Sequence, residues 1–133
     1  MLRWTSLVSG AGAFLAAHAV ERAAWLSWFG PAYSPWFLNS GRAVAFTAGC
    51  VLVAGLLASA LARDRDDALV HGGNVAAGAA VAMGFVLFLG PGPGTISPVV
   101  LLIGTVIVAV SGVAGTLLTF PFKARRGGAG DAR

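Results

Sequence analysis

The chain has 133 residues, of which 57% are hydrophobic and 11% are charged. Soluble domains contain roughly 45–50% apolar and about 25% charged residues, and a soluble fold this short could not bury so much apolar surface. The net charge of +4 comes from a few basic residues near segment ends, which argues against a nucleic-acid-binding face, and the single Cys50 excludes an internal disulfide.

Long apolar segments predict four helices, at about residues 4–29, 41–62, 68–89 and 98–120. Segments of this length match a hydrocarbon core of about 30 Å. We therefore expect an all-α, polytopic integral membrane protein, with a four-transmembrane-helix bundle over residues 1–122. A basic, Gly-rich cytoplasmic tail over residues 123–133 is expected to contact anionic headgroups.

The first predicted helix starts like a secretory signal, with Arg3 before an apolar run and the cleavage-like sequence Ala17-His18-Ala19. We expect this segment to be retained as a helix.

Polar residues follow on one stripe of the same helix, because His18, Glu21, Arg22 and Trp25 are spaced i, i+3, i+4 and i+7. One interpretation is an interfacial Glu21–Arg22 pair that ends the apolar span. The alternatives are a proton, ion or ligand site inside the bundle, since ionisable residues within a membrane are functional candidates, and a contact with another subunit.

The second, third and fourth helices contain small residues at four-residue spacing, which predicts close helix packing. Composition alone could also produce these spacings in an Ala-rich chain. The pairs are Gly55 with Ser59, Gly78 with Ala82, Ala80 with Gly84, and Ser111 with Gly115.

The third helix begins with a second polar pair, His71 and Asn74, and Asp66 or Asp67 is predicted to cap it. His71 lies near the start of its helix, whereas His18 lies far along its own helix. This difference in depth argues against one haem held by both histidines within the chain. A haem or quinone site shared with a partner chain remains an alternative.

The connections are rich in proline and aromatic residues. Residues 90–98 predict an outer turn, with a re-entrant segment as the alternative, because prolines remove the N–H donors that a phosphate-binding loop needs. Ser97 and Pro98 are expected to start the last helix and Pro121 to end it. An interfacial aromatic belt is predicted around the first connection, formed by Trp25, Trp28, Tyr33 and Trp36.

The distribution of Lys and Arg favours both termini on the cytoplasmic side of a bacterial inner membrane, with seven basic residues inside and two, Arg22 and Arg42, outside. A shift of sixty residues also aligns Trp25 with Phe85 and residues 30–31 with residues 90–91. These matches suggest two repeated helical hairpins; chance in an Ala- and Gly-rich chain is the alternative.

No catalytic motif, spaced acidic pair or metal-ligand pattern occurs in the sequence, so we expect neither an enzyme nor a bound cofactor. The small size and the scarcity of polar side chains favour a non-catalytic accessory subunit of a larger membrane complex. Its expected partners are lipids and other membrane subunits or further copies of itself. The alternative is a small oligomeric transporter or channel that uses His18, Glu21 and Arg22, together with Asn74.

Overall fold

The computed structural model describes residues 3–28, 41–89 and 98–127, and over these residues the protein is helical. The elements are α1 (Trp4–Trp28), α2 (Gly41–Ala58), a short 3-10 helix η2 (Ser59–Leu61) that continues α2, α3 (Arg65–Leu89) and α4 (Pro98–Gly127). The four predicted helices are all present. The two predicted connections at residues 30–40 and 90–97, with Tyr33 and Trp36, lie outside the described residues.

Three of these helices are long and apolar enough to cross a membrane. The apolar stretches cover Gly41–Leu61, Arg65–Leu89 and Leu102–Thr119. α1 is as long as α3, at 25 residues, but is not among them. Its second half contains His18, Glu21 and Arg22, which lower its mean hydropathy. Length and composition therefore support three membrane spans. Whether α1 is a fourth span depends on how it packs against these helices.

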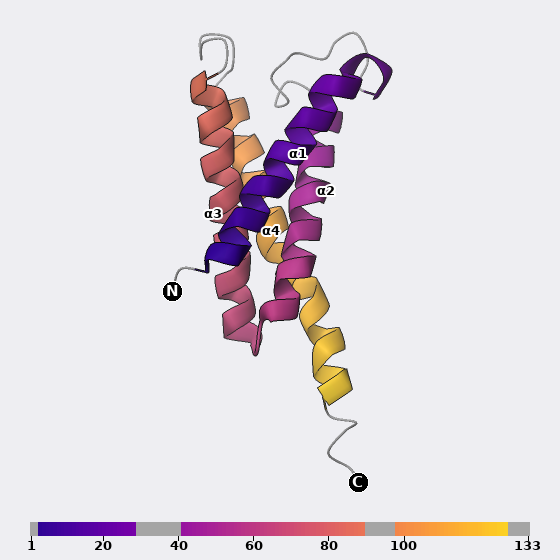
Figure 1. The fold of residues 1–133 in the computed structure, drawn as a ribbon, viewed down its shortest axis with the longest axis vertical. Helices are drawn as coiled ribbons and strands as arrows, with labels where there is room; N and C mark the ends of the chain where they lie inside the picture. The colour runs from indigo at the N-terminus through magenta and orange to yellow at the C-terminus, as the bar shows by residue number, and fades with distance from the viewer. Residues whose placement is uncertain (1–2, 29–40, 90–97, 128–133) are drawn as a thin grey trace.

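The helices form a bundle in which neighbours along the chain run in opposite directions (Figure 1). α1 and α3 run parallel to each other, and α2 and α4 run the other way. The starts of α1 and α3 and the end of α4 therefore lie at one end of the bundle, together with the α2–α3 turn. The most extensive packing is between α1 and α3 and between α2 and α4.

Helix α3 begins three residues earlier than predicted, and its cap is neither Asp66 nor Asp67. The cap is Asp64, whose Oδ1 accepts a hydrogen bond of 2.8 Å from the backbone N–H of Asp67. Asp67 instead reaches back, and its Oδ2 accepts a bond of 3.1 Å from the backbone N–H of Arg63. The arrangement resembles a capping box, except that Asp67 accepts from the residue before the cap rather than from the cap itself.

Helix α4 begins at Pro98 as expected, while Ser97 lies outside the described residues. Pro121 does not end it, because the helix continues to Gly127. Proline removes one backbone hydrogen bond, but its fixed φ is compatible with a helix, and helices that cross membranes tolerate it. α4 thus passes the predicted boundary between residues 122 and 123, and the separate tail remains a prediction; residues 128–133 lie outside the described residues.

Helices α1 and α3 are held together by two reciprocal glycine contacts. A Cβ added at Gly10 would meet the carbonyl oxygen of Val75, and one added at Gly78 would meet that of Leu7. In both cases the carbonyl belongs to the residue three positions before the partner glycine. Only glycine allows two helix backbones to approach this closely, which favours Cα–H···O contacts between them.

Helices α2 and α4 repeat the same arrangement. A Cβ at Gly55 would meet the carbonyl oxygen of Gly112, and one at Gly115 would meet that of Leu52. One turn further along, the hydroxyl groups of Ser59 and Thr119 form a hydrogen bond across the interface. Both pairs of parallel helices therefore use one packing geometry.

The predicted packing positions differ in their burial. Ser111 is half-buried and its hydroxyl donates to the carbonyl of Ile107, 2.7 Å away in the same helix. Gly84 is exposed, and no described atom lies within 4 Å of the position of an added Cβ, so its pairing with Ala80 makes no helix contact here. The predicted positions that are buried in the bundle are Gly55, Ser59, Gly78, Ala82 and Gly115.

Small side chains fill the interior of the bundle and large apolar side chains lie on its surface, which is the reverse of a soluble protein. The buried positions are mostly Ala, Gly, Ser and Thr, with few larger apolar residues such as Phe14 and Val51. Large apolar side chains are exposed on all four helices, for example Leu57 at 70% and Phe88 at 87%. Water would disfavour such a surface, whereas lipid tails would not.

Candidate functional site

One group of polar side chains connects the starts of α1 and α3. We call Arg3, Ser6, Asp67, His71 and Asn74 the Asp67 cluster. The guanidinium of Arg3 donates to Asp67 Oδ1 at 2.8 Å, and the backbone N–H of Arg3 donates to Asn74 Oδ1 at 3.1 Å. Ser6 Oγ and His71 Nδ1 share a hydrogen bond of 2.6 Å, and His71 Nε2 lies 3.7 Å from Asp67 Oδ2. The cluster therefore joins two helices far apart in the sequence.

His71 is buried within this cluster, with 4% of its surface exposed. Its contact with Ser6 fixes its depth in the bundle. His18 lies twelve residues after Ser6 on α1, which corresponds to about 18 Å along a helix axis. The two histidines therefore lie at different depths, as the sequence predicted, and cannot bind one iron within this chain.

A second polar site lies between α1 and α2. Glu21 is fully buried, and its Oε1 accepts a hydrogen bond of 2.6 Å from Thr47 Oγ1, which is also buried. Glu21 Oε2 is buried and has no hydrogen-bond partner among the described residues. Asn74, predicted to act with this carboxyl in a transport path, belongs to the Asp67 cluster at the other end of α1.

The predicted polar stripe of α1 is divided by the packing. Glu21 faces the bundle, His18 is half-buried with its ring stacked on Phe14 at 6.3 Å, and Arg22 is exposed. No ion pair joins Glu21 to Arg22, although both are described, so the expected interfacial pair is absent. The side chain of Trp25 lies outside the description. The stripe therefore contains one buried carboxyl rather than a connected site.

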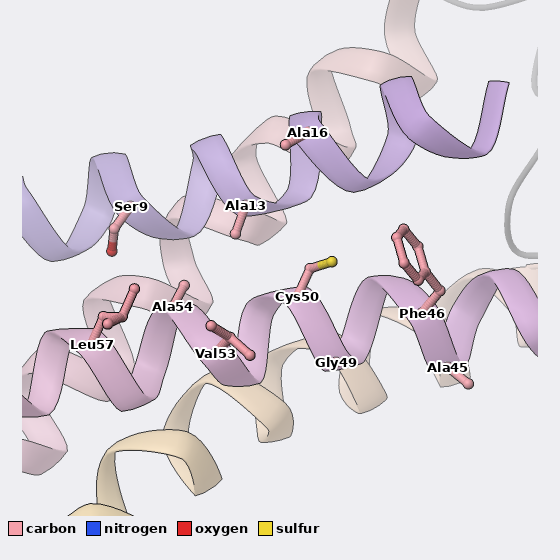
Figure 2. A pocket seen from close by; sticks show the side chains of 10 residues that line it. All are labelled: Ser9, Ala13, Ala16, Ala45, Phe46, Gly49, Cys50, Val53, Ala54 and Leu57. Atoms are coloured by element: carbon pink, nitrogen blue, oxygen red, sulfur yellow. The ribbon is translucent and has the colours of Figure 1, made fainter. Parts of the chain in front are cut away.

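A groove of about 710 Å³ lies between α1 and α2. Figure 2 shows Ser9 and Ala13 of α1 directed towards α2, and Phe46 and Cys50 of α2 directed towards α1. The walls are almost entirely apolar, and most lining residues are small. Phe46 also contacts Trp28 edge-on, with ring centroids 6.1 Å apart.

Several residues of these sites were not predicted from the sequence. Arg3 and Ser6 were missed because each acts through a helix far away in the chain. A signal did exist on α3, where Asp67, His71 and Asn74 follow the i, i+4, i+7 spacing of one helix face. Thr47 carried no such signal, because its partner Glu21 is on another helix.

Among the described residues, no three His, Cys, Asp or Glu side chains lie together as metal ligands would. The polar sites therefore offer hydrogen bonds and one buried carboxyl. No protein-family model, curated protein or solved structure matches this chain. The function must accordingly be argued from the sites themselves.

Proposed function

We propose that this protein is a non-catalytic accessory subunit of a larger complex in the bacterial inner membrane. In this proposal it crosses the membrane four times, with both termini in the cytoplasm, and its α1–α2 groove receives a transmembrane helix of a partner subunit. The observation that carries the proposal is the apolar groove of about 710 Å³ on the side of the bundle.

The lining of the groove supports a helix as its occupant. Ala13, Gly49 and Ala54 are among the residues of its walls. The protein joins its own parallel helices through small residues, and helices in lipid associate in general by such close contacts. A partner helix with an apolar, small-residue face would gain the same van der Waals contacts along this groove.

The packing of α1 supports a fourth span. α1 lies alongside both α2 and α3, two of the helices that are apolar enough to cross a membrane. Glu21 is turned inward, while Val8, Leu15 and Val20 are exposed. This orientation keeps one of the ionisable side chains of α1 away from lipid, and the exposed Arg22 can extend towards the interface.

The experiment fills the groove without disturbing the bundle. Gly49 lines the groove, and no atom lies within 4 Å of the position of an added Cβ, so Gly49→Leu fits the fold while occupying the groove. Gly84→Leu is the matched control, because Gly84 is also open but is not among the groove residues. Each variant is purified in mild detergent at native expression level, and the co-purifying membrane proteins are quantified by mass spectrometry.

We expect a partner that co-purifies with the unchanged protein and with Gly84→Leu but is lost with Gly49→Leu. Equal recovery with both variants would contradict the groove as the docking site. Recovery of lipid alone would contradict the accessory role. So would movement of an ion or solute by the purified protein in liposomes, which would favour the transporter alternative.

A further inference from the structure

The buried carboxyl of Glu21 has no part in the proposed accessory role. None of its surface is exposed, and Thr47 supplies its one hydrogen bond from the described residues, to Oε1. Oε2 is also buried and has no partner among these residues. A carboxylate has room for about four hydrogen bonds, so this environment leaves most of its capacity unmet.

Among the described residues of its own helix, none forms an ion pair with this carboxyl. Arg22 is exposed and forms no ion pair with it, and the ring of His18, one turn earlier, is stacked on Phe14. Arg3, at the start of α1, forms its ion pair with Asp67. Arg3 and Arg22 are therefore directed elsewhere.

The described side chains of the neighbouring helices form no ion pair with it either. On α2, Arg42 is exposed at the helix start, and Cys50 carries a thiol that is not a cation. In α3 and α4, the sequence from residue 72 to residue 122 contains no titratable residue. His71 is a buried ionisable residue of α3, but it is held in the Asp67 cluster at the far end of the bundle.

An unpaired carboxylate in such a place would be costly, because transfer of an isolated charge into an apolar medium costs far more than transfer of a neutral polar group. A neutral carboxylic acid accepts the same hydrogen bond from Thr47 at a much lower cost of burial. We propose that Glu21 and Thr47 form a proton-binding site inside the bundle, in which Glu21 binds one proton and Thr47 donates to its carbonyl oxygen.

The geometry favours a proton over a larger cation. A metal ion needs several oxygen ligands around it, and the described residues bring no cluster of three such side chains together. A proton needs one oxygen, and Oε2 is available. The site does not depend on the groove, so it stands whether or not the groove holds a partner.

The sequence makes this site directly observable. Glu21 is the only glutamate in the chain, and there is no glutamine. Protein grown with carbon-13 at the glutamate carboxyl therefore gives an infrared difference spectrum, labelled minus unlabelled, that reports Glu21 alone. The full-length protein is measured in lipid vesicles at neutral pH.

We expect the labelled band at the position of a protonated acid, with no labelled carboxylate band. The control is the double variant Glu21→Leu, Asp66→Glu, which moves the only glutamate to the exposed start of α3 without introducing a glutamine that would also carry the label; there the carboxylate band should appear. Thr47→Val should retain the acid band and shift it to higher frequency, because one hydrogen bond is lost. A carboxylate band for Glu21 at neutral pH would overturn the proposal, and an unshifted band in Thr47→Val would overturn the role of Thr47.

Discussion

The reciprocal glycine contact between α1 and α3 predicts that Gly78→Ala separates these helices. An added Cβ would overlap the carbonyl oxygen of Leu7 and lie 3.1 Å from the backbone nitrogen of Ala11. Both are backbone atoms, so no flexible side chain can move aside. Overpacking of this kind costs about 1–3 kcal/mol of unfolding free energy.

Gly84→Ala is the matched control on the same helix, because its Cβ would meet no other atom within 4 Å. Both changes gain about 1 kcal/mol of helix propensity, so the difference between the two variants isolates the overlap. Unfolding is followed by tryptophan fluorescence as a denaturing detergent is added to protein in mild detergent. Equal stability of the two variants would refute the close packing of α1 and α3.

Two further predictions concern the starts of α1 and α3 and use the same unfolding assay. Ser6→Ala should lower the unfolding free energy by about 1–3 kcal/mol, because it removes the hydrogen-bond partner of buried His71. The control Ser27→Ala, at an exposed site, should change it by less than about 0.5 kcal/mol, and equal losses would contradict a specific Ser6–His71 bond. Asp64→Ala should cost about 1 kcal/mol through loss of the α3 cap, while Asp66→Ala should not. A larger loss with Asp66→Ala would show that the cap is assigned to the wrong residue.

The sequence was sufficient to predict the helices, because long apolar runs and prolines act locally. All four predicted helices are present, and α1, α2 and α4 start where expected. The end of α4 was missed because Pro121 was expected to stop the helix, a rule taken from interior positions of soluble helices. The start of α3 was missed because three nearby aspartates could each act as a cap.

The pairing of helices was beyond the reach of the sequence. Spacing of small residues marked Gly55, Gly78 and Gly115, but it also marked Gly84, where an added Cβ would meet no described atom of another helix. Gly10 was missed because its partner carbonyl is on α3. Spacing states which residues share a helix face, but not which face meets another helix.

The glycine contacts can be compared with the predicted repeat of two helical hairpins. Gly55 and Gly115, which occupy equivalent positions in the α2–α4 contact, are sixty residues apart, whereas Gly10 and Gly78 are not. The sixty-residue alignment of the first and third helices is therefore not the alignment of their contacts. A duplicated hairpin remains a prediction.

For the polar residues too, the sequence indicated which residues share a helix face but not what that face contacts. His18, Glu21 and Arg22 were predicted to share a stripe, and only the fold turns Glu21 inward and Arg22 outward. His71 and Asn74 were predicted in the first turn of a helix, whereas α3 begins earlier, at Arg65, and their partners Ser6 and Arg3 were not foreseen.

In the proposed topology, all four helices cross the membrane, α1 included. Its most direct test replaces Cys50 by alanine and introduces single cysteines at the exposed positions Thr5, Ser27, Arg42 and Asp66 for labelling of intact cells with a thiol reagent that cannot cross the membrane. We expect the cysteines at 27 and 42 to be labelled from outside, and those at 5 and 66 to be labelled only after the membrane is opened. Labelling of positions 5 and 27 from the same side would show that α1 does not cross the membrane.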